Sequence, residues 1–425
     1  MNALSPEDTL HPVVRLSPAV PVPDHIAPET VYDFDMYFDP GLLANPHERV
    51  REMLREAPPV FWTPRNDGHW VILGHQEIYK ASRDTEVFSS EMMPREMVAA
   101  AMAMMPSGGP YIPQPTPINL DPPDHTKFRQ PLQLAFSPRA MLARKEEVRA
   151  LANSLIDAVI EQGHCDFLPT IAEPLPVQVF LKMMGLPLER AGEFRDLVHY
   201  FLEPMSTIEE FAIRMRRVAD AMTGEIEARR VDPKDDLISL LWKAQVDGEP
   251  MTFETMEDFA VLLFIAGLDT VINGMAYGVR HLASDPELQE ELRANPKLIV
   301  EAAEELLRRY TFTVPTRRIT RDSEFEGVSL KANERVMLYL PAADLDTREF
   351  ANAEKFDLDR EVKVHIAFGA GPHRCLGSHL ARIELQVLYE QMLERLPTFR
   401  LDERAPVKFH GGSIIAIDSL PLRWD

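Results

Sequence analysis

The strongest constraint on how this chain folds is one cysteine in a glycine-punctuated loop near its C-terminus. Residues 368–377 read FGAGPHRCLG, and apolar residues at helical spacing follow over residues 376–393. Glycines let another group approach the backbone closely, and the first turn of a helix offers free amide N–H groups that stabilise a thiolate. We therefore predict that Cys375 is the thiolate ligand of a haem iron, with Phe368 and Gly369 lining the cofactor.

An alternative interpretation of Cys375 is a buried free cysteine at a tight turn, which is the commoner role of a lone cysteine. That interpretation needs the glycines and the helix start to coincide with the cysteine by chance. The other cysteine in the sequence is Cys165, which we expect to be structural. So few cysteines point to a reducing compartment rather than to a disulfide framework.

Charge and hydropathy exclude several classes of protein. A net charge of −22 argues against binding to nucleic acid or to an anionic membrane, because both need concentrated positive charge. There is no apolar run of about 18 residues and no signal-peptide pattern, so we expect a cytoplasmic protein without a membrane anchor. Prolines concentrate in residues 1–30, which we predict to be an extended or disordered arm before a single domain over residues 31–425.

The pattern of apolar and turn residues predicts one β-hairpin followed mostly by helices. Residues 60–63 and 69–73 are aromatic and β-branched, and the Asn-Asp-Gly sequence at residues 66–68 between them is a strong turn signal. Short strand patterns surround residues 325–328 and 335–338. Helical periodicity is clearest at residues 138–162, 188–201, 208–229, 252–283, 285–294, 297–310 and 377–396. The sequence therefore predicts a mainly α (α+β) fold with small β parts.

The predicted helix over residues 252–283 carries polar residues in its apolar middle. Residues 264–271 read FIAGLDTV. Glycine inside a helix costs about 1 kcal/mol relative to alanine, and an unpaired buried carboxylate costs more, so we expect a compensating role for Gly267, Asp269 and Thr270. The alternative is the polar face of a partly exposed helix, with Thr270 donating a hydrogen bond to the carbonyl four residues earlier.

These segments, together with others, resemble the cytochrome P450 superfamily, and most closely its soluble bacterial class that includes the camphor hydroxylase. The resemblance runs nearly from end to end. It includes DFDMY at residues 33–37, GHW at 68–70, FSS at 88–90, DPP at 121–123, AGLDT at 266–270, ELLR at 305–308 and LPLRWD at 420–425. It implies one large helical domain with a long central helix over the haem and a smaller β-containing region.

The resemblance also implies roles for individual residues around haem b. Cys375 would be the axial ligand. On the other face of the haem, Gly267 would make room for dioxygen, Asp269 would help to bring protons from solvent, and Thr270 would hydrogen-bond the bound oxygen. The propionates need positive charge and planar donors, and the positions that match the family pattern are His125, Arg129, Arg317 and His373.

Two choices within this pattern rest on spacing. Arg317 adjoins Arg318, and counting back from the strand-like segment that follows selects Arg317. A further ion-pair triad is matched by Glu305, Arg308 and Arg360, which the resemblance places behind the cysteine loop. We expect this triad to be structural rather than catalytic.

A methionine-rich segment over residues 91–110 bears on the choice of substrate, because in the family this region forms a wall of the substrate pocket. Methionines adapt to an apolar guest, although a methionine-rich helix is more often ordinary core. Further wall candidates lie at residues 201–205 and 413–415. The predicted substrate contacts are Met97, Met102, Met105, Tyr111, Ser413 and Ile414. The segment before Asp-Pro-Pro is longer than in the camphor enzyme, so we expect a small apolar terpenoid or norisoprenoid, such as an ionone-like ring ketone, rather than camphor.

The resemblance implies a haem-thiolate monooxygenase that inserts one oxygen atom of O2 into a C–H bond. The chain has neither a dinucleotide-binding fingerprint nor a cysteine cluster, so its electrons must come from another protein. We expect a [2Fe-2S] ferredoxin with its NAD(P)H-dependent reductase, docking on Lys127, Arg129 and Arg374, unless these are solvated charges without a partner. We expect a monomer that binds neither nucleic acid nor membrane.

Two other classes of function stay open at this point. A haem-thiolate sensor would bind a ligand without turnover and would not need the acid–alcohol pair. A cysteine-nucleophile hydrolase would use Cys375 with His373 or His379, but no orienting acid or oxyanion geometry can be read from the loop.

Overall fold

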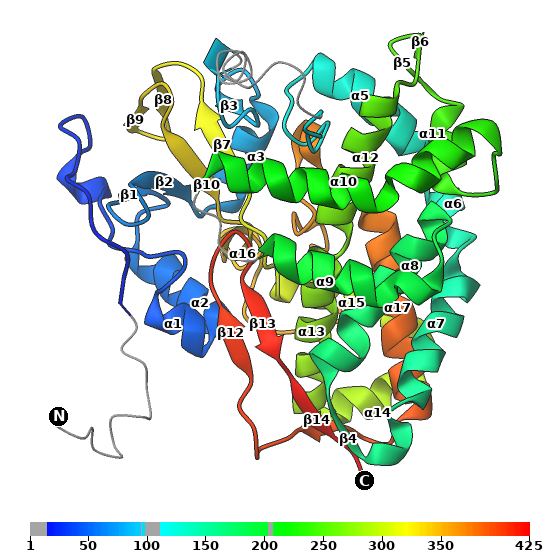
Figure 1. Ribbon diagram of the computed structural model, residues 1–425. Coiled ribbons are helices and arrows are strands. Elements are labelled where there is room, and N and C mark those ends of the chain that lie inside the picture. The colour runs from blue at the N-terminus through cyan, green and yellow to red at the C-terminus, as the bar shows by residue number, and fades with distance from the viewer. Residues whose placement is uncertain (1–14, 95, 98–110, 203–206) are drawn as a thin grey trace, which may run out of the picture.

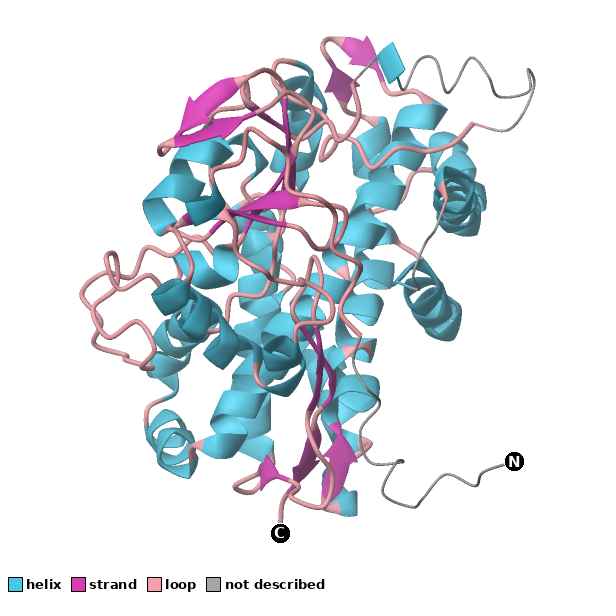
Figure 2. Ribbon diagram, turned by 90° about the vertical axis from the view of Figure 1, so that its left-hand side faces the viewer, coloured by secondary structure: helices cyan, strands magenta, loops and turns pink. Residues whose placement is uncertain are grey.

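A computed structural model describes residues 15–94, 96–97, 111–202 and 207–425. Figure 1 shows the strands β1, β2, β8, β9 and β10 on the left and most of the helices on the right, with α12 and α13 running through the centre. Figure 2 shows that helices make up far more of the molecule than the short strands do. The prediction of a mainly α fold with a smaller β region is therefore confirmed.

Helices supply the larger part of the structure. They are α1 Pro40–Ala44, α2 Pro46–Glu56, α3 His75–Arg83, α5 Asp124–Ala135, α6 Pro138–Leu142, α7 Lys145–Asp157, α8 Pro174–Met184, α9 Ala191–Leu202, α10 Ile208–Val231, α11 Leu237–Trp242, α12 Phe253–Gly267, α13 Asp269–Ser284, α14 Pro286–Ala294, α15 Ile299–Arg309, α16 Leu340–Ala343 and α17 Ser378–Arg395.

Strands form one five-stranded sheet and several small pairings. The large sheet has the order β1-β2-β10-β7-β3, and the strands are β1 Val60–Thr63, β2 His69–Ile72, β3 Phe88–Ser89, β4 His164–Asp166, β5 Gln245–Val246, β6 Glu249–Pro250, β7 Thr316–Ile319, β8 Ser323–Phe325, β9 Val328–Leu330, β10 Arg335–Leu338, β11 Arg400–Leu401, β12 Lys408–His410, β13 Ala416–Ser419 and β14 Pro421–Arg423.

The predicted hairpin is present. Strands β1 and β2 pair antiparallel, and the turn between them holds Asn66, Asp67 and Gly68 at positive φ. Every residue of the two strands is buried, so both faces of the pair are covered by other parts of the protein. The free edge of β2 pairs with β10 in parallel register. The turn chemistry, which was visible in the sequence, therefore fixed the register of the first two strands.

The described part of the proline-rich arm packs against this hairpin. The Val20 amide donates to the Pro64 carbonyl at 2.9 Å, and Ile26 is buried in the smaller of two apolar clusters. Residues 1–14 lie outside the described part of the chain. The division at residue 30 stays a prediction.

Two predicted helices are interrupted. The pattern over residues 138–162 becomes the two helices α6 and α7. Met141 of α6 and Val148 of α7 are both buried, and this spacing of apolar residues is compatible with one helix or with two. The central helix begins where expected, with the Thr252 hydroxyl accepting from the Thr255 amide at 3.1 Å. It is interrupted at Leu268, whose φ of −104° and ψ of −62° stay in the right-handed helical region but depart from the usual helical φ.

The central helix belongs to the protein core. By length and composition alone Phe253–Ser284 could span a membrane, but 67% of its most apolar window is buried inside the protein. Tyr389 of α17 anchors it by donating to the Gly274 carbonyl at 3.0 Å. A Cβ atom on Gly278 would lie 1.9 Å from the Tyr389 hydroxyl oxygen, so α13 and α17 approach closely only because residue 278 is glycine. This packing fixes α17, which follows Cys375, against the helix that carries Asp269.

We predict that Gly278→Ala destabilises the protein even though alanine is the better helix former. Overpacking typically costs about 1–3 kcal/mol, against a gain of about 1 kcal/mol in helix propensity. Gly224→Ala is the matched control, since a Cβ atom there meets nothing within 4 Å. Thermal unfolding should show a lower midpoint for Gly278→Ala and an equal or higher one for Gly224→Ala. Equal midpoints for the two variants would contradict the close packing.

Candidate active site

The cysteine loop is held by backbone contacts that require glycine. The Cys375 amide donates to the Phe368 carbonyl at 2.8 Å. Gly369 and Gly371 have φ of +72° and +69°, and a Cβ atom on Gly371 would lie 2.2 Å from the Ser82 carbonyl oxygen. Backbone conformation and steric contact therefore explain why residues 369 and 371 are glycine. These two glycines let the loop turn sharply against the end of α3.

The Cys375 side chain is exposed although dense protein surrounds it, so its sulfur borders open space inside the fold. Burial raises the pKa of the thiol, while a hydrogen bond from the Gly377 amide and the charges of Arg129 and Arg374 lower it. Burial is the largest of these effects. The expected help from the helix start is thus present, but it does not ionise the thiol by itself, and coordination to a metal cation would.

The middle of the central helix also borders open space. Phe264 and Leu268 are buried, yet Ala266 and Gly267 between them are exposed, and a Cβ atom on Gly267 would meet nothing within 4 Å. Exposed positions in the middle of a core helix mark a hollow against that helix. Gly267 therefore borders this hollow, and its predicted role in making room for dioxygen stays a prediction.

Four of the predicted cofactor-binding residues form a cluster of donors. The rings of His125 and His373 lie 4.2 Å apart between centroids. Burial lowers the pKa of His125 to about 4 with help from the charge of Arg129, and burial with the charge of Arg317 lowers the pKa of His373 to about 2. Arg129 donates to the Arg374 carbonyl.

This cluster has no carboxylate in an ion pair within the described residues, although the charge of Asp121 acts on Arg317 and His125. Within the described ranges neither Arg129 nor Arg317 forms an ion pair with a carboxylate, and burial lowers the pKa of Arg317 to about 10. Both ring nitrogens of His125 and Nε2 of His373 are buried without a hydrogen-bond partner. Buried polar groups are normally paired. The residues present therefore fit a group that brings carboxylates, as the two haem propionates would.

The structure separates the two adjacent arginines of β7. Arg318 donates to the Glu91 carbonyl at 2.7 Å and to Asn333 at 3.3 Å, whereas Arg317 acts on His373. Neighbouring side chains on a strand point to opposite faces, so only one of the two can join the cluster. The spacing argument had selected the one that does.

Asp269 sits in a small acidic network. Burial raises the pKa of its carboxyl, the charges of Asp418 and Glu173 act in the same direction, and His410 acts against them. His410 Nδ1 lies 2.6 Å from Asp418 Oδ1, and this contact raises the pKa of His410. Asn273 binds both sides, donating to the Asp269 carbonyl at 3.1 Å and accepting from the Ile417 amide at 3.0 Å. The β12–β13 hairpin is thereby fixed beside the acid.

Thr270 makes the contact that the alternative interpretation anticipated. Its hydroxyl donates to the Ala266 carbonyl at 3.1 Å. A hydroxyl has one donor and two acceptor positions, so this bond uses its hydrogen and leaves its lone pairs available as acceptors. The bond orients Thr270 without deciding between the two interpretations.

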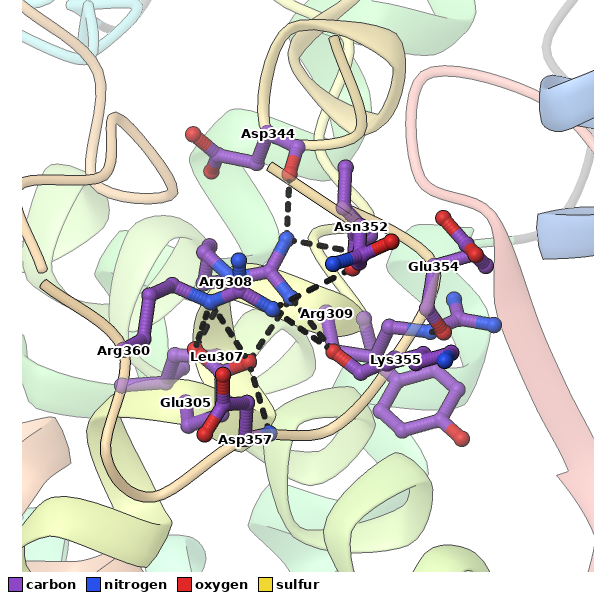
Figure 3. Close-up of polar contacts among 12 residues, drawn as sticks. Glu305, Leu307, Arg308, Arg309, Asp344, Asn352, Glu354, Lys355, Asp357 and Arg360 are labelled. Carbon is purple, nitrogen blue, oxygen red and sulfur yellow. Dashed lines mark hydrogen bonds and ion pairs between the residues drawn. The ribbon is translucent and has the colours of Figure 1, made fainter. Parts of the chain in front are cut away.

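The predicted ion-pair triad is buried and fully hydrogen-bonded. Glu305 accepts from Arg308 at two distances of 2.8 Å and from Arg360 at 3.0 and 3.2 Å (Figure 3). Arg308 also donates to the carbonyls of Asp344 and Ala353. One carboxylate thus holds two arginines, and these bind the backbone of the long segment that precedes the cysteine loop.

The predicted substrate contacts are scattered or undescribed. Tyr111 donates to Asp258 at 2.9 Å, and Met97 is 59% exposed. The Ser413 carbonyl accepts from Val314, and Ile414 packs on the main core. Met102 and Met105 lie outside the described residues, as does most of the predicted wall at 201–205. These roles stay predictions.

Sequence reasoning missed two polar groups. Glu257 on α12 pairs with Arg216, and its neighbour Asp258 binds Tyr111 and the Gln114 amide. An acid in an apolar helical run is the same signal that identified Asp269, so both could have been found. The His410–Asp418 pair joins two strands of a hairpin, and no local pattern announces it.

The expected basic patch is weaker than its composition suggests. Lys127 lies 3.0 Å from Asp247 and 3.6 Å from Asp124, which offset its charge. Arg129 turns inward to the cluster, whereas Arg374 is exposed.

Comparisons with known proteins agree on one family. The family model described as Cytochrome P450 matches residues 177–421. A probable cytochrome P450 127A1 of Sinorhizobium fredii is 34% identical over 95% of this chain and 97% of its own. A steroid C26-monooxygenase of Mycobacterium tuberculosis is 33% identical over 87% of this chain and 98% of its own.

Solved structures agree with these relatives. The structure of CYP101J2 has a TM-score of 0.85 at 32% identity and covers 96% of this chain and 100% of that one. The structure of CYP101C1 has a TM-score of 0.85 at 30% identity and covers 95% of this chain and 100% of that one.

We predict that Glu305→Gln destabilises the protein by about 3–5 kcal/mol, because it leaves two buried arginines without their carboxylate. Haem retention should fall with it, since the triad supports the segment before Cys375. Glu326→Gln, which removes the exposed partner of Lys80, is the control and should change little. Thermal unfolding and haem content per protein would measure both, and an unchanged midpoint in Glu305→Gln would refute the role assigned to the triad.

Proposed function

The chain belongs to the cytochrome P450 family, and on that premise we propose that it inserts one oxygen atom of O2 into a C–H bond of a small apolar compound. Haem with a cysteine thiolate ligand is the cofactor of this family. The observation that carries the proposal is an exposed cysteine inside the fold together with a cluster whose histidines keep buried nitrogens without hydrogen-bond partners.

We assign the residues as follows. Cys375 would ligate the iron, and the propionates would be held by Arg129, Arg317, His125 and His373. The bound haem supplies the activation of dioxygen. The remaining steps that the protein controls are the exclusion of water, the orientation of the substrate and the delivery of protons.

Proton delivery is the part that this chain's own residues explain. Burial raises the pKa of the Asp269 carboxyl, which favours its protonated form relative to that of an exposed acid, and Thr270 lies next to it on the same turn. His410 and Asp418 form the next group outward, and both are half exposed to solvent. We propose that protons pass from this pair to Asp269 and then to the Thr270 hydroxyl. A sensor without turnover would not need such a chain of groups.

We propose a terpenoid or norisoprenoid ring ketone as substrate. The relatives include a steroid C26-monooxygenase and a methyl-branched lipid omega-hydroxylase, which supports an apolar substrate class. The narrower choice rests on the methionine-rich segment over residues 91–110, whose side chains would adapt to an apolar guest.

For electrons we propose a [2Fe-2S] ferredoxin and its reductase, with Arg374 as an exposed positive contact. We further propose a cytoplasmic monomer. Among the described residues, the helix that is apolar enough to cross a membrane lies mostly buried in the core.

The proposed function is tested by reconstituted turnover. Purified holoprotein is screened with a panel of terpenoids for a spin-state shift, and the best compounds are incubated with a ferredoxin, its reductase and NAD(P)H. We expect a hydroxylated product and the reduced, carbon-monoxide-bound spectrum of a thiolate-ligated haem. Ligand binding without any product across ferredoxins would favour the sensor instead.

We predict that Thr270→Ala separates reductant use from product formation. NAD(P)H consumption should continue, while product per NAD(P)H falls by about tenfold or more and hydrogen peroxide replaces it, because proton delivery loses its last hydroxyl. Thr270→Ser keeps the hydroxyl and is the control. Unchanged coupling in Thr270→Ala would count against the assignment.

We predict that Asp418→Asn shifts the pH profile of coupled turnover. Asp418 raises the pKa of His410, so protonated His410 is available below that raised pKa and is lost as the pH rises through it. Without Asp418 this loss occurs at lower pH, and the alkaline limb of product per NAD(P)H should move in that direction. Asp402→Asn, whose ion pair with Arg404 lies within a separate surface loop, is the control. Superimposable profiles would exclude the pair from proton delivery.

A further inference from the structure

A pocket outside the proposed active site also contains buried polar atoms without hydrogen-bond partners. It has a volume of about 230 Å³ and lies where the start of α2 meets the ends of α13 and α15. Its lining residues are Asn45, His47, Glu48, Arg280, His281, Ser284, Arg309 and Tyr310. No role in the proposed oxygenation involves this pocket.

Four of these residues carry a buried polar atom without a hydrogen-bond partner. The atoms are Nδ1 of His47, Nε of Arg280, Nε2 of His281 and NH1 of Arg309. Such atoms are uncommon in folded proteins. The cluster of His125, Arg129, Arg317 and His373 also has buried polar atoms without partners, and there they fit the propionates of haem. The recurrence of such atoms in this pocket points to a missing ligand.

The charge of the pocket selects an anion. Neither Arg280 nor Arg309 forms an ion pair with an acid anywhere in the described segments, and Arg280 makes no side-chain hydrogen bond there and only lies over the Phe409 ring at 5.3 Å. Arg309 donates one bond, to the Glu354 carbonyl at 2.5 Å. Glu48 is the acid that lines the pocket, and Arg51 offsets it at 2.6 Å.

The helix ends that meet at this pocket differ in their effect on a bound anion. The ends of α13 and α15 bring carbonyls, which disfavour an anion. The start of α2 adds little to offset them, because Pro46 has no amide hydrogen and the amides of Glu48 and Arg49 both donate to the Asn45 carbonyl at 3.1 Å. With the two unpaired guanidinium groups, the balance is positive.

The histidines indicate which anion fits. Burial and the nearby arginines lower the pKa of His47 to about 3 and of His281 to about 4, and Asp285 opposes this at His281. Both are therefore neutral. His47 is 2% exposed, and its Nε2 lies 2.9 Å from the Thr311 carbonyl, so Nε2 is the donor and the unpartnered Nδ1 is an acceptor. Hydrogen phosphate offers both acceptor oxygens to arginine and a hydroxyl to such a nitrogen, whereas a carboxylate offers only acceptors.

We infer that this pocket binds a phosphate group, either as the free ion or as the phosphomonoester end of a larger molecule. Arg280 and Arg309 would clamp its oxygens and His47 would accept its hydroxyl. A site of this kind joins α2 to the ends of α13 and α15, and so links the helix of Asp269 to the helix of the Glu305 triad.

The test uses the holoprotein and does not depend on monooxygenase activity. Titration calorimetry with inorganic phosphate at constant ionic strength should show one site. Arg280→Gln should weaken binding by about tenfold or more, as expected for loss of a charged hydrogen bond. It is chosen because its guanidinium makes no hydrogen bond within the described chain, so the fold should tolerate the change. Arg139→Gln, an exposed arginine of α6, is the control for net charge and should bind phosphate as the parent does.

Three further arms define the ligand. Thermal unfolding in phosphate should give a higher midpoint than in chloride at equal ionic strength for the parent and Arg139→Gln, but not for Arg280→Gln. Ribose 5-phosphate that binds as well as phosphate would identify a phosphomonoester as the ligand, and failure to bind would identify the free ion. Acetate binding as tightly as phosphate would overturn the choice of phosphate. Equal phosphate binding by the parent and Arg280→Gln, or none by either, would overturn the site.

Discussion

The buried carboxylate of Glu305 is the interaction on which the active site depends. It binds Arg308 and Arg360 together, and these arginines in turn bind carbonyls between residues 344 and 355. The segment before Cys375 has little regular structure, so these hydrogen bonds replace the ladders that a helix or sheet would give it. The close packing of α17 on α13 adds the second constraint and relates the cysteine loop to the acid–alcohol pair.

The distribution of unpaired charge separates structural from ligand-binding clusters. The Glu305 triad leaves none of its buried polar atoms without a hydrogen bond, because both arginines also donate to backbone carbonyls, and it needs no ligand. The cluster around His125 and Arg317 and the pocket around Arg280 and Arg309 bury donors that the protein leaves unpaired. Leaving such groups unsatisfied costs stability, so their presence is understandable where a ligand completes them.

Much of the site was predictable because its signals are local. The glycines around Cys375, the polar residues in the apolar middle of the central helix and the Asn-Asp-Gly turn each impose a geometry on a few neighbouring residues. Contacts between distant segments were not predictable in this way. Three features depend on which elements come to lie side by side. They are the break at Leu268, the approach of His410 and Asp418 to Asp269, and the direction of Lys127 toward Asp247.

The sequence by itself determined the chemistry available to this protein: a cysteine in a glycine loop, an acid–alcohol pair inside an apolar helix, and the family to which both belong. Tertiary structure decided which charged groups share a cavity and which are paired. Arg317 and Arg318 are neighbours with the same side chain, and only the two faces of β7 separate the one that joins His373 from the one that binds Glu91 and Asn333. Burial and pairing are properties of contacts between distant segments, and those contacts exist only once the chain has folded.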